Sequence, residues 1–408
     1  MTGTSSSEMT EPGLDPSVDP PDLQSQGAEE GGLPPWIKGF LAVAAVYLFI
    51  AAVNMMGEGL KCIARDDAGR NFLEWLFGLV SDQPVMGLFI GLLATSIVQS
   101  SSFTTSMTVG LVAVGDISLV SAIPIIMGAN IGTSVTNILV SLANMRRPLQ
   151  FRRSLEGAIV HDFFNVLSVL VILPLEVAFG IISRPAEMIS RGLGDTRFFQ
   201  SDPTQHMGFL KKTFGVVGHF FRWLLVDGLG LSPTFGGAVI AILALIMLFM
   251  ALWLLVKLLR GLLLRRLSGM FSRTIFRRPG IAFVAGIITT ASVQSSSVTT
   301  SLMVPLVGAG VLKLRQIYPY TLGANIGTTI TAMLAALGTG SAAAMACAFA
   351  HLLFNLYGII IFWPLQFIPI SLAEGFAKLA SRRRLIAAAY IIVFFFLLPL
   401  LVILITSL

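Results

Sequence analysis

The sequence predicts an all-α polytopic membrane protein built from two inverted-topology repeats, each with a re-entrant helical hairpin carrying Gln-Ser-Ser-Ser and broken helices at the midplane. Three observations predict it: the composition, a long internal repeat and the placement of Lys and Arg. Of the 408 residues, 55% are hydrophobic and 12% are charged, about half the charged share of a soluble domain. Apolar runs near the roughly 20 residues that span a bilayer exclude an ordinary soluble enzyme, a disordered protein and a nucleic-acid-binding protein.

The internal repeat relates residues 91–142 to residues 286–337 at a constant offset of 195. About half of the aligned positions are identical, which is well above chance for apolar segments. The identities concentrate in polar and glycine positions. The matching strings are Gln99-Ser-Ser-Ser with Gln294-Ser-Ser-Ser, Thr104-Thr-Ser with Thr299-Thr-Ser, Gly128-Ala-Asn-Ile-Gly-Thr with Gly323-Ala-Asn-Ile-Gly-Thr and, at offset 190, His161-Asp-Phe-Phe-Asn with His351-Leu-Leu-Phe-Asn.

Lys and Arg in short loops indicate the cytoplasmic side of a membrane. In the first repeat the arginines follow the glycine motif, at Arg146, Arg147, Arg152 and Arg153. In the second they precede Gln-Ser-Ser-Ser, at Arg260, Arg265, Arg266, Arg273, Arg277 and Arg278. Equivalent landmarks therefore fall on opposite sides of the membrane, which is typical of the inverted repeats of secondary transporters.

The chain divides accordingly into seven segments of a multi-pass plasma-membrane protein. The first 33 residues hold seven acids and no Lys or Arg, and such a segment cannot bury enough apolar surface to order itself. We therefore expect a disordered acidic cytoplasmic tail over 1–33, a first transmembrane helix and amphipathic stretch over 34–84, repeat 1 over 85–183, an extracellular linker over 184–232, a transmembrane helix and basic cytoplasmic loop over 233–279, repeat 2 over 280–370, and a cytoplasmic loop with the last transmembrane helix over 371–408.

The Gln-Ser-Ser-Ser motifs interrupt apolar runs that are too short to span a membrane. Polar residues at membrane depth are costly unless they line a cavity or are buried in protein, so we expect two half-length helices meeting at each motif. A helix N-terminus suits an anion, and hydroxyl and amide oxygens suit a hard cation such as sodium. Ser and Thr also simply pack membrane helices, but two copies, each followed by a Gly-x-Asn-x-Gly-Thr motif, favour a binding site.

These strings, with Pro124-Ile-Ile-Met-Gly-Ala-Asn-Ile-Gly-Thr-Ser-Val-Thr-Asn and Ala158-Ile-Val-His-Asp-Phe-Phe-Asn-Val-Leu-Ser-Val-Leu-Val-Ile-Leu-Pro-Leu-Glu, resemble the type II sodium-dependent phosphate cotransporter family over most of residues 36–405. The resemblance implies sodium-coupled import of hydrogen phosphate by elevator-like alternating access. It implies phosphate, sodium and membrane lipids as partners, no cofactor beyond Na+ as coupling ion, and a monomer as transport unit, with a dimer left open.

The resemblance also implies two sets of site residues. Phosphate would be surrounded by Gln99, Ser100, Ser101, Ser102, Thr104, Ser295, Ser296, Ser297 and Thr299. Sodium would be held by Gln294, Ser295, Ala324, Asn325, Thr328 and Thr331. Family members commonly carry Ser at the position of Ala324, which here offers only its backbone carbonyl. Asn130, Thr133 and Asp162 are additional candidates.

Ionisable residues inside apolar segments suggest function. Because His161 and His351 are repeat-related, we expect a structural hydrogen bond in each half. Asp162 has no counterpart; we expect it to pair with Arg152 or Arg153, with cation binding as the alternative. Glu176, near a helix end, should be solvated. Cys62 and Cys347 form neither a disulfide framework nor a metal site, and we expect Cys347 to pack as a small apolar residue.

Three other functions stay open at lower weight: symport of another small anion, an anion channel, and an intramembrane hydrolase using a Ser with His161 and Asp162. Adjacent helical residues point about 100° apart, so this His and Asp do not form a relay by themselves, and no Gly-x-Ser-x-Gly string occurs. We therefore expect the protein not to be an enzyme. Sodium-dependent accumulation of phosphate against its gradient separates a symporter from a channel.

Overall fold

The computed structural model describes residues 34–71, 83–194, 215–270 and 275–406, and the expected tail over 1–33 lies outside them, as does part of the expected linker. Within these ranges the regular elements are all helical. In chain order they are α1 (Pro35–Ile63), α3 (Pro84–Val98), α4 (Ser101–Val114), α5 (Leu119–Gly132), α6 (Ser134–Leu142), α7 (Pro148–Phe179), α8 (Ser183–Gly194), a π-helical turn (Trp223–Gly228), α11 (Pro233–Met270), a 3-10 turn (Ile275–Arg277), α12 (Pro279–Val293), α13 (Ser296–Ser301), α14 (Met303–Gly308), α15 (Leu314–Thr339), α16 (Ala342–Phe362), α17 (Phe367–Arg382), α18 (Leu385–Ile392), a π-helical turn (Val393–Leu397) and α19 (Leu398–Thr406).

Seven helices in the described ranges are long and apolar enough to cross a membrane, which confirms the all-helical, multi-pass class. These spans are Gly39–Ile63, Leu119–Leu142, Pro148–Phe179, Pro233–Ala251, Leu314–Thr339, Ala342–Phe362 and Leu385–Thr406. Four further apolar helices are shorter: Pro84–Val98, Ser101–Val114, Pro279–Val293 and Ser296–Gly308. The shorter helices are the ones that meet at the Gln-Ser-Ser-Ser motifs.

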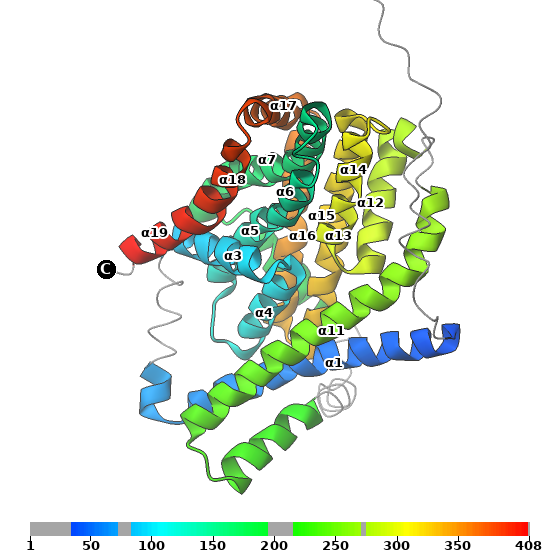
Figure 1. The fold of residues 1–408 in the computed structure, drawn as a ribbon. Helices are drawn as coiled ribbons and strands as arrows, with labels where there is room; N and C mark the ends of the chain where they lie inside the picture. The colour runs from blue at the N-terminus through cyan, green and yellow to red at the C-terminus, as the bar shows by residue number, and fades with distance from the viewer. Residues whose placement is uncertain (1–33, 72–82, 195–214, 271–274, 407–408) are drawn as a thin grey trace, which may run out of the picture.

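The two long helices α1 and α11 lie side by side along one flank of the molecule (Figure 1). Their backbones approach closely at glycine, where a Cβ on Gly59 would lie 2.9 Å from the carbonyl oxygen of Gly237. Helix α1 ends at Ile63, within the segment 34–84 that the sequence assigned to it. Helix α11 runs further than expected, because it continues to Met270 through the basic stretch that was expected as a loop.

The helices that carry the Gly-Ala-Asn-Ile-Gly-Thr motifs pack backbone to backbone against the helices that end at the Gln-Ser-Ser-Ser motifs. Helix α5 packs on α3, and α15 packs on α12. A Cβ on Gly128 would overlap the carbonyl oxygen of Leu88, and a Cβ on Gly323 would overlap that of Phe283. Only glycine permits these contacts, and the repeat offset of 195 relates one to the other. The glycine motifs thus hold α5 against α3 and α15 against α12.

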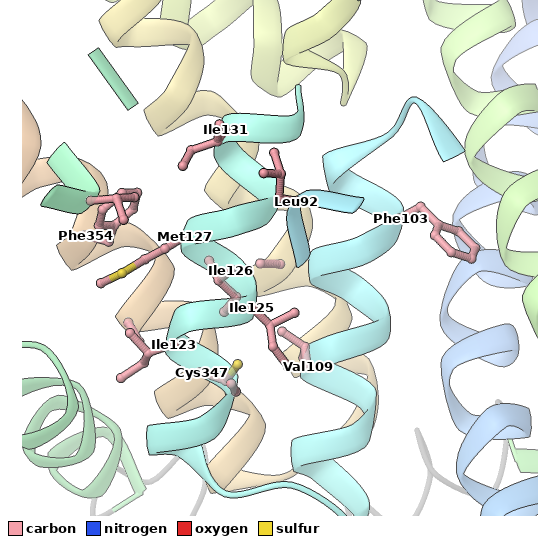
Figure 2. Close-up of a cluster of buried hydrophobic side chains, with 14 of the residues drawn as sticks. Leu92, Phe103, Val109, Ile123, Ile125, Ile126, Met127, Ile131, Cys347 and Phe354 are labelled. Atoms are coloured by element: carbon pink, nitrogen blue, oxygen red, sulfur yellow. The ribbon is translucent and has the colours of Figure 1, made fainter. Parts of the chain in front are cut away.

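A buried hydrophobic cluster joins the two halves of the chain. Figure 2 shows Leu92, Ile126 and Met127 from the first half beside Cys347 and Phe354 from α16. Cys347 is fully buried, so it packs as the small apolar residue that the sequence predicted. Close-packed side chains of this kind hold α3, α4, α5 and α16 together.

Two expectations for polar segments were wrong. Glu176 is 5% exposed; its Oε2 accepts the main-chain N–H of Ile182 at 2.5 Å and that of Ser183 at 3.3 Å, because the chain reverses after α7 and its amide groups need acceptors. The stretch before the last span, expected as a loop, is largely helix α17. Its small residues Ala373 and Ala377 are buried, on a helix that packs against α7.

Candidate binding site

Each Gln-Ser-Ser-Ser motif forms the same turn between two helices. Helix α3 ends at Gln99 with φ 58° and ψ 29°, and α12 ends at Gln294 with φ 58° and ψ 24°. They are the only residues other than glycine with positive φ in the described ranges. This left-handed conformation is uncommon for a residue with a side chain, and residues in such sparsely populated conformations cluster at functional sites. We call these two segments the Gln-Ser turns.

The residue after each glutamine begins the next helix. Ser100 Oγ accepts the N–H of Phe103 at 3.2 Å, and Ser295 Oγ accepts the N–H of Val298 at 3.3 Å. A serine in this N-cap role satisfies one of the free amide groups of the first helical turn. Both candidate serines are therefore positioned by the local backbone, and each hydroxyl keeps its own proton to donate.

The side chains of the two glutamines are held in matching ways. Thr136 Oγ1 donates to Gln99 Oε1 at 2.8 Å, and Thr331 Oγ1 donates to Gln294 Oε1 at 2.9 Å. The amide of Gln99 donates to the carbonyl of Ser96, as that of Gln294 does to Ala291. Sequence reasoning named Thr331 but missed Thr136, although the repeat offset relates the two threonines.

A third matched contact closes each turn. Thr104 Oγ1 accepts from Thr95 Oγ1 at 2.8 Å, and the hydroxyls of Thr299 and Thr290 lie 2.7 Å apart. All four side chains are 2% exposed or less. Thr95 and Thr290 were not among the predicted residues; their positions one turn before each glutamine and their repeat relation are the signal that finds them.

The structure brings the two Gln-Ser turns into contact. Ser102 Oγ donates to the main-chain oxygen of Gln294 at 3.0 Å. Nearby, Thr300 Oγ1 donates to Asn137 Oδ1 at 3.1 Å, again across the two halves. The candidate phosphate residues from both halves therefore belong to one region, as a single shared site requires.

Three candidate serines keep their hydroxyls unused. Ser101 and Ser296 are 3% exposed and Ser297 is 5% exposed. None of these hydroxyls makes a hydrogen bond within the described part of the chain. Serine hydroxyls in this state can donate to the oxygens of an anion.

The remaining candidates of the sodium set lie on α15, with all four side chains buried: Ala324, Asn325, Thr328 and Thr331. Thr328 Oγ1 donates to the carbonyl of Ala324 at 3.0 Å, so its oxygen still has lone pairs free. Thr133 makes the equivalent bond to Ala129 at 3.1 Å. The oxygens gathered on this helix are those of hydroxyls, amides and carbonyls, which are ligands that hard cations accept.

The asparagines of the glycine motifs are held from the opposite half. Asn325 Oδ1 lies 2.6 Å from His161 Nε2, and Asn325 Nδ2 donates to Asn165 Oδ1 at 2.8 Å. Both partners lie on α7 of the first half, one helical turn apart on one face. The expected hydrogen bond of His161 exists, but it crosses between the halves.

The reciprocal set has the same form. Asn130 Oδ1 lies 3.2 Å from His351 Nε2, and Asn130 Nδ2 donates to Asn355 Oδ1 at 3.1 Å. We call His161–Asn325 and His351–Asn130 the crossed pairs. Their four side chains are 3% exposed or less, so each of these hydrogen bonds is shielded from water.

Asp162 is fully buried, and Tyr390 Oη on α18 donates to its Oδ2 at 2.5 Å. The expected pairing with Arg152 or Arg153 was wrong, because Arg152 pairs instead with Glu156 at 2.9 Å, one turn away on the same helix. The other carboxylate oxygen of Asp162 has no hydrogen-bond partner among the described residues. Within those residues, no hydrogen bond or ion pair joins Asp162 to either Gln-Ser turn.

The fold and these contacts define a class: a multi-pass helical membrane protein whose two halves present equivalent polar turns to each other. Comparison with known proteins narrows the class. Residues 48–184 and 246–363 match the family described as Na+/Pi-cotransporter. The chain belongs to this family, which confirms the resemblance found in the sequence; the family is one of cotransporters rather than enzymes.

Named relatives agree. The chain is 33% identical to sodium-dependent phosphate transport protein 2B of Bos taurus, over 85% of this chain and 61% of the relative. It is 34% identical to sodium-dependent phosphate transport protein 2A of Rattus norvegicus, over 85% of this chain and 63% of the relative. The chain thus spans less than two thirds of the length of these relatives. No solved structure matches it.

Proposed function

We propose that this protein is a sodium-coupled symporter that imports inorganic phosphate across the plasma membrane. The observation that carries the proposal is the pair of Gln-Ser turns, equal in backbone conformation and joined by the bond from Ser102 to Gln294. The family and the relatives named sodium-dependent phosphate transport proteins support the choice of ions.

In the proposed site, hydroxyls and first-turn amides of the Gln-Ser turns hold hydrogen phosphate. The phosphate set is Gln99, Ser100, Ser101, Ser102, Thr104, Ser295, Ser296, Ser297 and Thr299. The free hydroxyls of Ser101, Ser296 and Ser297 make the first contacts. Gln294, Ser295, Thr328, Thr331 and the carbonyl of Ala324 hold sodium, whose charge offsets that of the anion and lowers the desolvation cost of carrying either alone. Asn325, which the resemblance also places in the sodium set, is left out because its side chain bonds to His161 and Asn165.

The two halves are proposed to be inverted repeats with re-entrant hairpins at the Gln-Ser turns. Supporting this, one helix of each matched pair begins after a basic residue and its counterpart after a neutral one. The pairs are α3 after Gln83 with α12 after Arg278, α5 after Ser118 with α15 after Lys313, and α16 after Ser341 with α7 after Arg147. Basic ends face the cytoplasm, so matched helices point in opposite directions and the N-terminus is cytoplasmic.

Inverted repeats give two related states, and the proposed mechanism is alternating access with an elevator-like movement of one unit, the monomer being the transport unit. The segment boundaries expected from the sequence, with repeats over 85–183 and 280–370, are retained in this proposal. Symport of a different small anion is the alternative, since hydroxyls and amides do not by themselves choose phosphate over sulfate.

The decisive experiment is uptake of radiolabelled phosphate by the purified full chain in liposomes. We expect accumulation above the outside concentration only with an inward sodium gradient, and competition by unlabelled phosphate but not sulfate. Equilibration of phosphate across the membrane without sodium would indicate a channel. Sodium-driven uptake of sulfate in preference to phosphate would indicate that sulfate is the substrate. No uptake above empty liposomes by folded protein would sink the proposal.

A further inference from the structure

Both hydrogen-bonding atoms of each asparagine side chain have partners: Oδ1 bonds to the histidine of the crossed pair, and Nδ2 bonds to a second asparagine. Asn325 Nδ2 donates to Asn165, so Asn325 Oδ1 is an acceptor and His161 Nε2 donates to it in the shorter of that nitrogen's two contacts, at 2.6 Å; the longer contact, 3.3 Å to Asn165 Nδ2, is then not a hydrogen bond. The same reasoning applies to Asn130, which donates to Asn355 and accepts from His351. The hydrogen-bond pattern thus assigns one tautomer to both histidines.

The crossed pairs also connect mechanically to the Gln-Ser turns. Asn325 lies on α15, which carries Thr331, the residue that holds the Gln294 side chain. Asn130 lies on α5, whose Gly128 packs against the backbone of α3 at Leu88 and whose Gly132 packs at Thr95, one turn before Gln99. A histidine of one half is therefore connected, through one rigid helix pair, to the Gln-Ser turn of the other half.

We propose that His161 and His351 are positioning residues, each of which sets the Gln-Ser turn of the opposite half by holding its asparagine. The amides of Asn325 and Asn130 serve this cross-connection and are not ligands of sodium. The reciprocity supports it: a histidine that only stabilised its own half would make its shortest side-chain contact within that half, and the shortest contact of each histidine instead reaches the other half. The transport consequences of this proposal rest on the proposed symport function, whereas its stability consequences do not.

The first test is a double-mutant cycle on thermal unfolding of the purified full chain. His161→Leu and Asn325→Ala are measured singly and together, and His351→Leu with Asn130→Ala likewise. Because each pair shares one interaction, we expect the double variant to melt at about the temperature of its less stable single variant. The control pair is Asn325→Ala with Ser190→Ala, whose hydrogen bonds belong to separate networks, and its losses should add. Additive losses in the crossed pairs overturn the proposal.

The second test is the sodium KM of phosphate uptake in liposomes. We expect His161→Leu and Asn325→Ala to raise it equally, by about tenfold for one buried hydrogen bond, with no further rise in the double variant. His161→Gln keeps an N–H donor and should restore the wild-type KM, and His219→Leu, at a side chain 60% exposed, should leave it unchanged. A raised KM in Asn325→Ala with a wild-type KM in His161→Leu would make Asn325 a ligand and overturn the proposal.

The failure of the symport function can be told apart from the failure of the positioning role of the histidines. If the wild-type chain takes up no phosphate, the symport function fails, and the unfolding cycle still decides the crossed pairs. If the leucine variants do not fold, His161→Gln is compared with His161→Asn, because the longer amide reaches Asn325 and the shorter one does not. Only His161→Asn should then raise the sodium KM, and equal values in the two overturn the proposal.

Discussion

Ser102 donates a hydrogen bond to the main-chain oxygen of Gln294, and the repeat-related bond from Ser297 to Gln99 is absent within the described residues. Two halves with equal turns are therefore joined unequally. We expect Ser102→Ala to lower the free energy of unfolding by about 1 kcal/mol, the net value of one hydrogen bond. Ser297→Ala is the matched control and should leave it unchanged. Equal effects in a denaturation series would contradict the asymmetry.

The unused hydroxyls predict where phosphate binds. Ser101→Ala and Ser296→Ala should each reduce phosphate uptake in liposomes by tenfold or more, since a hydrogen bond to a charged ligand is worth about 1.5–3 kcal/mol, and should leave the melting temperature unchanged. Ser106→Ala provides the control, because this hydroxyl is buried on the same helix as Ser101 without a hydrogen-bond partner. Wild-type uptake in both test variants would return these serines to a packing role.

The matched threonines test whether sodium binds in one half or in both. Thr331→Val frees the Gln294 side chain and removes a proposed sodium ligand, so we expect a rise of about tenfold in the sodium KM. Thr136→Val makes the same change at Gln99 and should alter the phosphate KM while leaving the sodium KM within about twofold. Equal rises in the sodium KM would place a second sodium ion at the first Gln-Ser turn.

Asp162 offers a test that separates charge from hydrogen bonding. Asp162→Asn keeps an acceptor for Tyr390 and removes the charge, whereas Tyr390→Phe keeps the charge and removes the donor. If Asp162 holds an additional cation, the alternative role that the sequence left open, the Hill coefficient for sodium falls in Asp162→Asn and stays at the wild-type value in Tyr390→Phe. Equal Hill coefficients in both variants and the wild type would leave Asp162 with a structural role.

Asp116, in the connection between α4 and α5, gives a prediction for pH. Burial raises the pKa of this carboxyl, with Lys61 opposing the rise, and Oδ2 has no hydrogen-bond partner among the described residues. A carboxyl whose folded-state pKa exceeds its unfolded value stabilises the fold at low pH, and this contribution is lost as pH rises through the folded-state pKa. Asp116→Asn should therefore raise the melting temperature at pH 7, and the gain should vanish near about pH 3, below the ordinary carboxyl pKa.

Asp67→Asn is the control for that measurement, because its side chain is 92% exposed. Its melting temperature should follow that of the wild type across the pH series. A gain from Asp116→Asn that persists at low pH would show that the charge of Asp116 is not the cause.

Apolar composition predicted the all-helical, multi-pass class, and duplication made the location of the Gln-Ser turns visible in the sequence. Residues that adopt the same conformation in both halves, such as Gln99 and Gln294, are the same amino acid 195 positions apart. Thr136 could have been found in the same way, since the offset carries Thr331 onto it. Apolar length and composition predicted the spans, because the bilayer imposes a thickness on every such helix.

Contacts between the halves could not be predicted from the sequence. The offset states which residues are equivalent, and equivalence does not imply contact: His161 is equivalent to His351 and bonds to Asn325. The partner of Asp162 was missed because Tyr390 lies 228 residues further along the chain. Glu176 was misjudged because its acceptor role depends on the reversal of the backbone after α7, which no side-chain pattern signals.

The crossed pairs have a consequence for biosynthesis. The chain is made from its N-terminus, so His161 must wait for Asn325, 164 residues later, and Asn130 must wait for His351, 221 residues later. At about 5–20 residues per second, that delay is on the order of 10–40 seconds. During this interval the newly made first half holds polar side chains whose native partners do not yet exist. The first half therefore gains its full set of native hydrogen bonds only after the second half has been made.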